Sequence, residues 1–515
     1  MFAHIYSAGT YGIKAQVVDV EIHLQKGTGS FSMVGLPDNA VRESKDRVYA
    51  AIKTSGLSYP WGNHITVNLA PADLKKEGSA FDLPIAIGLL VASEQIQSEP
   101  LKDFIILGEL SLDGTLRPVH GVLPMALLAK KEGIKGMILP KANAREAAMV
   151  EGVSVYAVES LMETVNFLND AGESLAPCTV DMKEIFTGKQ KYPIDFADVK
   201  GQETVKRSLE VAAAGGHNII MMGPPGSGKT MLAKRLPTIL PPMTFDEAIE
   251  TTKIHSVAGL LPPDTALIAT RPFRSPHHTI SDSALVGGGT IPRPGEISLS
   301  HHGVLFLDEL PEFARNVLEV MRQPLEDGHV TISRSKMSID YPANFMLVCA
   351  MNPCPCGYYT DPAKECTCNT GQIQKYMAKI SGPLLDRIDL HIEVPAIKYK
   401  EMASKEVGEH SDSIRARVIQ AREHQMKRFE GRKGLFSNAD MQSKEIQEFC
   451  KIDAAGEELL KMAINKLGLS ARAYDRILKV SRTIADLGNS SSIKPEHLGE
   501  AIQYRTLDRN LWMGG

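Results

Sequence analysis

The feature that most constrains the fold is a glycine-rich loop between a short apolar run and a helix. His217–Met222 reads HNIIMM, residues 223–230 read GPPGSGKT, and the chain continues as a predicted helix from Met231. The full GxxxxGK[ST] pattern between a strand and a helix is typical of a loop whose backbone N–H groups face phosphate oxygens. The partial positive charge of the helix N-terminus favours the same ligand. We therefore expect a nucleoside triphosphate to bind on the loop residues Gly223, Pro224, Pro225, Gly226, Ser227, Gly228, Lys229 and Thr230.

Two side chains of this loop and two acids elsewhere form a candidate hydrolytic set. Lys229 is expected to reach the β- and γ-phosphates, and the Thr230 hydroxyl to ligate Mg²⁺. A second apolar strand, residues 303–307, ends at Asp308 and Glu309. Ligands bind at the carboxyl ends of such parallel strands. Asp308 is therefore predicted to hold Mg²⁺ through water, and Glu309 to polarise the attacking water.

A third apolar strand, Phe345–Met351, ends at Asn352, whose amide can sense the γ-phosphate. With this strand the chain closely resembles AAA+ ATPases. The resemblance gives Asn352 the sensor 1 position and Arg387 the position of an arginine finger, which acts on a neighbour's nucleotide. It gives Arg472 the sensor 2 position in a helical lid. For both arginines an ordinary ion pair on a helix surface is the alternative.

Length and composition leave the class of protein open but exclude several kinds. A chain of 515 residues suggests roughly two to four domains. The net charge of -4 gives no bulk attraction to nucleic acid, so any DNA contact must come from a local basic surface. The N-terminus lacks the pattern of a signal peptide, and the longest apolar run, Leu83–Ala92, is too short to cross a bilayer. We expect a cytoplasmic protein with no membrane contact.

The order of patterns predicts an α/β protein in four parts. Residues 1–170 alternate strands and helices, among them a strand over Ala15–Leu24, a helix over Ala40–Ser55, a strand over His64–Leu69 and a buried helix over Phe81–Glu94. A polar linker is predicted over 171–191. Residues 192–395 alternate strands and helices in the way of a parallel sheet with crossovers, and residues 396–515 are mainly helical.

Inserts within residues 192–395 suggest which segments contact the substrate. The stretches 271–279 and 285–295 resemble the helix-2 insert of magnesium-chelatase-like and MCM-like AAA+ proteins, which projects toward a central pore. Residues 330–340 predict a hairpin just before Asn352, with Arg334 and Lys336 near its tip. Repeated around a ring, these cations suit a DNA backbone; an ordinary solvent-facing hairpin is the alternative. The paired histidines 277–278 and 301–302 are interpreted as polar loop residues rather than metal ligands.

Four of the seven cysteines lie in two close pairs. Cys354 and Cys356 precede a polar loop, and Cys366 and Cys368 follow it. Four thiolates in this arrangement fit a tetrahedral structural Zn²⁺ site, although the spacing is CxC rather than the more frequent CxxC. Reduced thiols in a flexible loop are the alternative. A secreted disulfide framework does not fit seven cysteines in a chain of this length.

The first part resembles the proteolytic domain of Lon-type proteases, an α+β domain of the ribosomal S5 domain 2 type. The stretches 76–83, 108–114 and 133–140 carry this resemblance. Lon proteases use a Ser–Lys dyad, in which the lysine activates the serine. Here the nucleophile position falls on Ala80, with Ser79 one place early, and the lysine position falls on Leu123. We therefore predict a Lon-like fold without peptidase activity, which forms a ring or a substrate platform.

From end to end the chain resembles the YifB/ComM family of magnesium-chelatase-like AAA+ ATPases. This resemblance implies a hexameric ring motor that uses ATP and Mg²⁺, binds single-stranded or branched DNA, and drives branch migration in recombination or natural transformation. A ring also follows from the trans-acting role expected of Arg387. The alternatives are a chelatase-like, protein-remodelling ATPase and an ATP-dependent peptidase.

Overall fold

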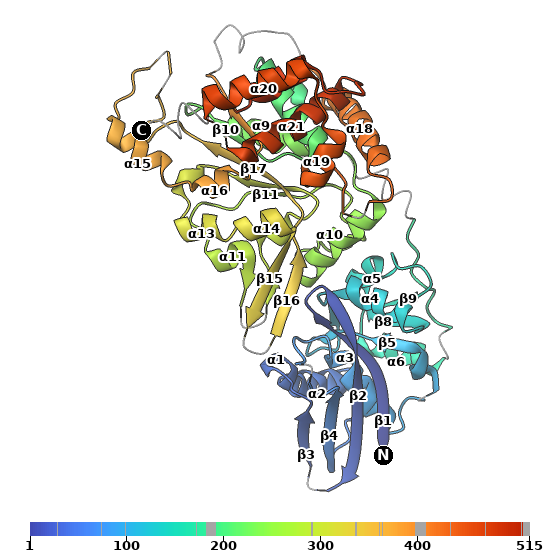
Figure 1. Cartoon of the computed structure of the whole chain (residues 1–515). Helices are drawn as coiled ribbons and strands as arrows, with labels where there is room; N and C mark the ends of the chain where they lie inside the picture. Colours follow the sequence, from blue (N-terminus) through green and yellow to red (C-terminus); the bar gives the residue numbers. More distant parts are fainter. Residues whose placement is uncertain are drawn as a thin grey trace. The chain divides into compact units, whose positions relative to one another are not determined.

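The structure is a computed structural model of the 515-residue chain (Figure 1). It describes all residues except 28, 74, 98, 171–172, 182–191, 290–291, 335–336, 360, 363, 397–407, 433, 469, 506 and 508–515. Contacts divide the chain into two compact units, which we describe separately. Unit 1 comprises Met1–Lys189 with Thr244–Ala269, and unit 2 comprises Gln190–Met243 with Thr270–Gly515.

A seven-stranded mixed sheet forms unit 1, in the order β3-β4-β2-β1-β5-β8-β9. The strands are β1 (Phe2–Tyr11), β2 (Lys14–Lys26), β3 (Ser30–Val34), β4 (Asn63–Ala70), β5 (Phe104–Ile106), β8 (Gly136–Pro140) and β9 (Ser154–Val158). Strands β1, β2 and β4 pair antiparallel, whereas β5, β8 and β9 run parallel. A short pair, β6 (Glu109–Leu110) and β7 (Leu116–Arg117), stands apart. The strands expected over Ala15–Leu24 and His64–Leu69 are confirmed as β2 and β4.

Helices pack on this sheet according to their apolar faces. They are α1 (Asn39–Arg42), α2 (Ser44–Thr54), α3 (Asp82–Ala92), α4 (Val122–Lys131), α5 (Lys141–Ala147) and α6 (Leu161–Asn169). All residues of α3 are buried, as expected for Phe81–Glu94. A side chain at Gly88 of α3 would come within 2.7 Å of Ile22, so glycine permits the close approach to β2. The helix expected over Ala40–Ser55 forms but is divided at Glu43 into α1 and α2.

Unit 1 also contains a helix from the middle of the chain, α10 (Phe245–Val257). A capping box of Thr244 and Glu247 begins it. The Ser256 carbonyl accepts a hydrogen bond from the N–H of Gly121, and the Ser256 hydroxyl donates to the buried carboxylate of Glu146. The segment 244–269 therefore packs with unit 1, although the sequence places it within 192–395.

Unit 2 is built on a five-stranded parallel sheet in the order β11-β14-β17-β10-β18. The strands are β10 (Ile219–Met222), β11 (Phe273–Arg274), β14 (Val304–Leu307), β17 (Met346–Met351) and β18 (Leu390–Glu393). Strands β10, β14 and β17 are buried throughout, which explains their unbroken apolar sequences. The predicted parallel sheet with crossovers is confirmed, and β17 lies between β10 and β14.

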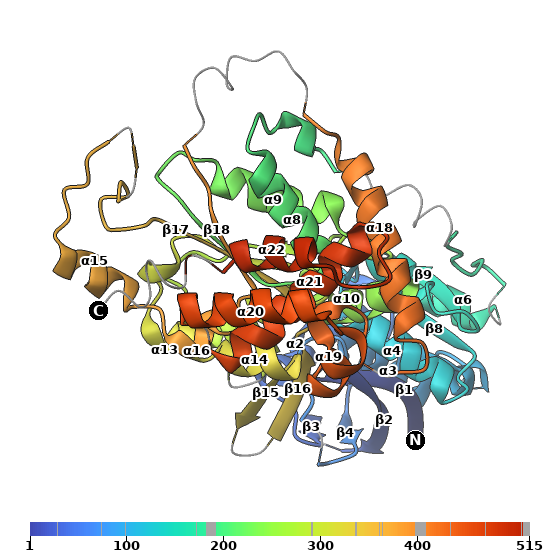
Figure 2. The same ribbon diagram turned by 45° about the horizontal axis from the view of Figure 1, so that its top comes forward.

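Helices α8 (Glu203–Gly215) and α9 (Lys229–Ile239) flank this sheet. The described C-terminal part of the chain is helical and contains α18 (Ser411–Arg428), α19 (Ser443–Phe449), α20 (Ala454–Leu467), α21 (Ala471–Leu487) and α22 (Pro495–Gln503). Figure 2 shows the last five gathered together. Asp389 at the start of β18 links them to the sheet, because its carboxylate bonds both His217 before β10 and Arg476 of α21. Burial by itself would raise the pKa of the Asp389 carboxyl. The neighbouring Arg476 and His217 have the larger effect, so the pKa lies below its ordinary value.

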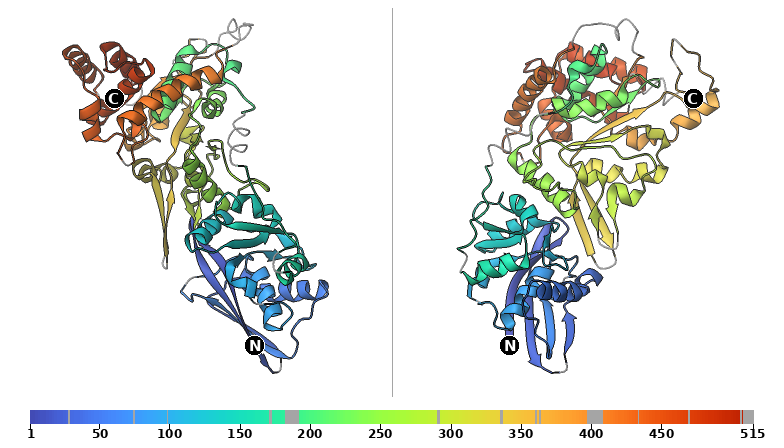
Figure 3. Two further views of the ribbon diagram at one scale, coloured as in Figure 1. Left: turned by 90° about the vertical axis from the view of Figure 1, so that its right-hand side faces the viewer. Right: turned by 180° about the vertical axis from the view of Figure 1, so that it is seen from behind.

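Short elements connect these layers: α11 (Asp282–Val286), β12 (Gly287–Gly288), β13 (Arg293–Pro294), α12 (Glu296–Leu299), α13 (Arg315–Glu319), α14 (Arg322–Asp327), α15 (Thr370–Met377) and α16 (Gly382–Leu385). The expected hairpin is confirmed as β15 (His329–Arg334) paired antiparallel with β16 (Met337–Pro342). Figure 3 shows it as a long ribbon extending from the body of unit 2. The Tyr341 hydroxyl of β16 donates to the Pro292 carbonyl, 2.8 Å away, so the hairpin packs against the β12–β13 insert.

Candidate active site

The predicted phosphate loop follows β10 directly and ends at α9. Gly226 and Gly228 have φ values of +78° and +87°, which L side chains rarely adopt, and this explains the glycines. The Lys229 ammonium donates to the carbonyls of Gly223 and Pro224 at 2.8 and 3.0 Å. Desolvation lowers the pKa of Lys229, while Asp308 and Glu309 oppose this shift. The Lys229 ammonium therefore lies inside the loop, at the position where a phosphate group would bind.

The strand order brings the predicted site residues together at one edge of the sheet. Because β17 lies between β10 and β14, Asn352 follows a strand that adjoins both the phosphate loop and the acidic strand. The Asn352 side-chain oxygen is 3.3 Å from the Lys229 nitrogen. On the other side, the Thr230 hydroxyl donates to the Asp308 carboxylate at 2.6 Å. These two oxygens are hard ligands of the kind Mg²⁺ prefers, and they already converge.

Glu309 stands in an unusual backbone conformation beside a histidine. Its φ is +54°, in the left-handed region, which is uncommon for a residue other than glycine and concentrates at functional sites. The side chain is 57% exposed, and one carboxylate oxygen lies 3.5 Å from Nδ1 of His278. His278 closely follows β11, the strand that pairs with β14. From the sequence alone, His278 is interpreted only as a polar loop residue; its position just after a strand of the parallel sheet is the available signal.

Both predicted arginines are associated with the short segment that follows α16: Arg387 belongs to it, and Arg472 lies near its Asp386. Arg387 is nearly buried, donates to the Pro383 carbonyl at 2.6 Å and forms an ion pair with Glu326 of α14. Arg472, at the start of α21, is 63% exposed and lies 3.6 Å from Asp386. Both arginines therefore pair with acids of their own chain, and their expected action on a nucleotide stays a prediction.

Comparison with known proteins decides the family. Residues 195–402 match the family described as magnesium chelatase, subunit ChlI, and residues 408–505 match its C-terminal family. Residues 20–143 match the family described as subunit ChlI of Mg-chelatase. Competence protein ComM of Haemophilus influenzae is 48% identical over 515 residues, which cover 99% of this chain and 98% of that protein. The uncharacterised protein YifB of Escherichia coli is 44% identical, over 98% and 97% of the two chains.

The chain belongs to the YifB/ComM family of magnesium-chelatase-like proteins. A more distant relative, the magnesium-chelatase 38 kDa subunit of Rhodobacter capsulatus, is 26% identical over 187 residues, which cover 32% of this chain and 53% of that protein. Membership makes the chain an AAA+ ATPase that uses ATP and Mg²⁺. Across the described residues, no helix combines the length and apolar character needed to cross a membrane.

This YifB/ComM-family chain carries its cysteine pairs directly after Asn352. The four sulfur atoms, of Cys354, Cys356, Cys366 and Cys368, all lie within 4.8 Å of one another. A backbone hydrogen bond at Tyr358 is the main cause that lowers the pKa of Cys356, to about 5. The structure therefore brings together the four predicted ligands, and none of them forms a disulfide.

Of the two predicted DNA residues, the structure describes Arg334, the last residue of β15 in the β15–β16 hairpin. Arg334 is exposed, and its Nε donates to the Gly289 carbonyl at 3.2 Å, next to the β12–β13 insert. Lys336 lies outside the described residues.

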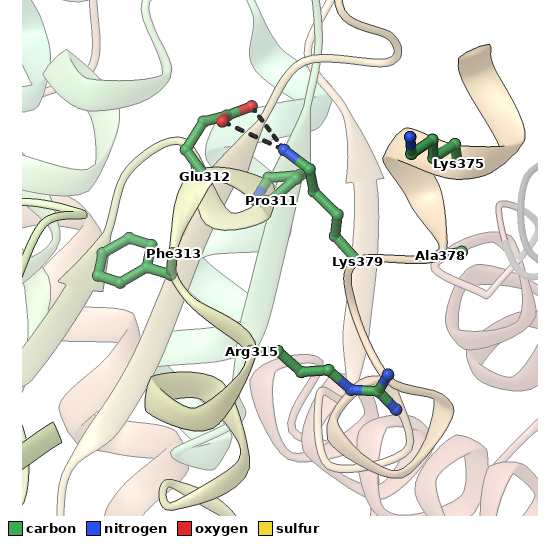
Figure 4. Close-up of a pocket in the computed structure, with 7 residues that line it drawn as sticks. All are labelled: Pro311, Glu312, Phe313, Arg315, Lys375, Ala378 and Lys379. Carbon is green, nitrogen blue, oxygen red and sulfur yellow. Dashed lines mark hydrogen bonds and ion pairs between the residues drawn. The ribbon is translucent and has the colours of Figure 1, made fainter.

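A second basic surface was not expected from the sequence. A pocket of about 370 Å³ is lined by Pro311, Glu312, Phe313, Arg315, Lys375, Ala378 and Lys379 (Figure 4). Glu312 and Lys379 form an ion pair at 3.2 Å, while the Arg315 side chain points away from that pair. Among the lining residues the cations Arg315, Lys375 and Lys379 outnumber the single carboxylate, Glu312.

Proposed function

We propose that this protein is an ATP-driven ring motor that acts on DNA, and that it moves branch points of recombination intermediates. The proposed ATPase activity rests on one observation: four site residues converge at one edge of the sheet, namely Lys229, Asn352, Thr230 and Asp308. Support for the DNA half comes from a relative covered almost end to end, which is named a competence protein. The exposed Arg334 on a projecting hairpin adds a local basic group despite the net charge of -4.

Each site residue has a proposed role in hydrolysis. The Thr230 hydroxyl and the Asp308 carboxylate would hold Mg²⁺, and Lys229 would bind the phosphates. Glu309, whose side chain is more than half exposed, orients and polarises the attacking water. Asn352 contacts the γ-phosphate from its position beside Lys229.

A ring follows from the proposed role of Arg387. An arginine finger stabilises charge on a phosphoryl group bound by the neighbouring subunit. In the single chain Arg387 is held by Glu326, so assembly would exchange this ion pair for a contact with nucleotide. Arg472 is proposed to act from the lid on the nucleotide of its own subunit. The hexamer is the ring size that the family resemblance implies.

Unit 1 is proposed to be a Lon-like platform without peptidase activity. The Ser79 hydroxyl donates to Glu109, and the Lys76 ammonium donates to the Pro71 carbonyl. A serine nucleophile needs a base that accepts its proton. A carboxylate partner in place of a lysine departs from the Ser–Lys arrangement, which counts against Lon-type peptidase chemistry at Ser79.

The second candidate is a chelatase-like ATPase that remodels a protein partner. It is favoured by the fact that all three matching families are described as magnesium chelatase subunits. The two candidates share the nucleotide site and differ in what stimulates it.

Stimulation of ATP hydrolysis separates them. We expect branched or single-stranded DNA to raise the steady-state ATPase rate of the full-length protein, and the Glu309→Gln variant to keep at most about 1% of the wild-type rate with or without DNA. An ATPase rate that is indifferent to DNA, together with no DNA binding at low salt, would favour the remodelling ATPase. Low salt is needed because phosphate contacts weaken steeply as salt rises.

A further inference from the structure

The four cysteine sulfurs have the spacing of ligands around a single metal ion. The Sγ of Cys354 lies 3.3 Å from that of Cys356 and 3.7 Å from that of Cys366, and the Sγ atoms of Cys356 and Cys366 are 3.6 Å apart. Zn–S bonds of about 2.3 Å in a tetrahedron place the sulfurs about 3.8 Å apart. A polynuclear iron–sulfur cluster needs wider spacing, because its cysteine sulfurs are divided between two or more iron atoms.

Backbone groups around the sulfurs match a thiolate site. The N–H of Cys356 donates to the Sγ of Cys368, and the N–H of Tyr359 donates to the Sγ of Cys354, both at 3.4 Å. Such donors stabilise negative charge on metal-bound sulfur and orient the ligands.

The same segment lies against the phosphate loop. Gly357 directly follows the ligand Cys356 and has a φ of +87°. A Cβ atom there would lie 2.6 Å from Cδ of Pro225 and 3.9 Å from Cγ of Asn352. The phosphate loop is also tied to the strand before the cysteines, because the Gly223 N–H donates to the Met351 carbonyl at 3.2 Å.

We propose that Cys354, Cys356, Cys366 and Cys368 bind one structural Zn²⁺, and that this ion holds the cysteine segment against Pro225 and Asn352, so that ATP affinity depends on zinc. Four protein ligands leave no open position on the ion, so its role is structural. The second half of the proposal rests on the proposed nucleotide site, whereas zinc binding stands without it.

The test uses full-length protein purified without chelator. Elemental analysis is expected to give one zinc and no iron per chain for the wild type, and little zinc for Cys366→Ser. The control Cys178→Ser removes a free cysteine outside the cluster and should keep the zinc. Wild-type protein without zinc, or with iron and visible absorption, would overturn the metal assignment. A cysteine disulfide found by mass spectrometry would do the same.

The link to the nucleotide is measured as the Kd of a fluorescent ATP analogue with Mg²⁺, in a Glu309→Gln background that prevents turnover. We expect Cys366→Ser to weaken binding about 10-fold, the scale found when supporting ligands of a metal site are lost.

Gly357→Ala keeps all four ligands, so it answers the objection that a cysteine variant merely unfolds. Its methyl group would lie 2.6 Å from Cδ of Pro225, and a φ of +87° is one that L side chains rarely adopt, so the segment must shift relative to the phosphate loop. We expect weaker ATP binding with the zinc content unchanged. Unchanged ATP affinity in both variants would overturn the link. If zinc-loaded wild-type protein did not bind ATP at all, the proposed nucleotide site would be wrong, whereas the proposed zinc site would be unaffected.

Discussion

At the scale of single residues, binding and hydrolysis are proposed to depend on different side chains. Lys229 lies inside the phosphate loop, whereas Glu309 is exposed beyond the end of β14. We expect Lys229→Ala to abolish ATP binding. Glu309→Gln should bind ATP normally and lower kcat by about 100-fold or more, since general base catalysis typically contributes that much. Equilibrium binding and steady-state ATPase assays check both, and wild-type turnover by Glu309→Gln would remove its assigned role.

His278 is expected to position Glu309, because its Nδ1 lies 3.5 Å from the carboxylate. His278→Ala should lower kcat about 10-fold with the KM for ATP nearly unchanged, since orientation of the base is lost but not phosphate binding. His278→Asn, whose amide can still donate, should recover part of the rate.

The neighbouring His277 provides the matched control for this prediction. Its ring bonds Thr279 at 2.9 Å and packs on the His278 ring with centroids 4.1 Å apart. Among the described residues it forms no ion pair with Glu309, so His277→Ala should lower kcat less than His278→Ala does. Equal losses in the two variants, or a change confined to KM, would show that the loop matters only for folding or binding.

At the scale of elements, the β15–β16 hairpin is predicted to contact DNA phosphates. Arg334→Ala combined with Lys336→Ala should flatten the dependence of log affinity on log salt, by about 0.7 per lost contact with a single strand. Fluorescence anisotropy at several salt concentrations measures this slope. Lys135→Ala with Lys141→Ala removes the same charge from exposed sites in unit 1 and serves as the control. An unchanged slope in the hairpin variant would exclude the hairpin from the DNA path.

The junction between the sheet and the C-terminal helices depends on Asp389. Removing one partner of a buried charge pair strands the other, so Asp389→Asn should lower the free energy of unfolding by about 3 kcal/mol at pH 7. Asp386→Asn nearby breaks the exposed contact with Arg472 and should cost less than about 1 kcal/mol. Denaturant titration of both variants makes the comparison.

The Asp389 contribution should also depend on pH. Because the folded-state pKa of Asp389 lies below its ordinary value of 3.8, the unfolded state binds the proton more readily. The stabilisation is therefore complete above the unfolded pKa and declines as the pH falls toward the folded pKa. The difference between wild type and Asp389→Asn should shrink below about pH 4. A difference that stays constant there would contradict the ionised assignment.

The elements that could be predicted from the sequence are the strands and helices whose patterns lie within a short stretch of the chain. Strands β10, β14 and β17 are unbroken apolar runs, and parallel pairing then brings their carboxyl ends together. The packing of 244–269 with unit 1 was not predictable, because it depends on distant partners such as Glu146 for Ser256. The contact of His278 with Glu309 likewise arises only when β11 pairs with β14. Local patterns carry no information on such pairings.

At the scale of the whole molecule, the two units share one chain in an interleaved order. The segment 244–269 leaves unit 2 after α9, which begins in the phosphate loop, and returns just before β11, which pairs with the strand leading to Asp308. Both ends of a segment packed in unit 1 therefore connect to elements of the nucleotide site. A motor that transmits nucleotide-dependent movement to unit 1 has a direct covalent route through this segment.

The most direct test of the proposed motor is strand exchange on a fluorescently labelled three-stranded branched DNA with ATP and Mg²⁺. We predict that wild-type protein moves the branch, and that Glu309→Gln binds the DNA but does not move it. If wild-type protein hydrolysed ATP while the branch never moved and no DNA bound, the proposed action on DNA would be wrong, and a protein-remodelling role would replace it.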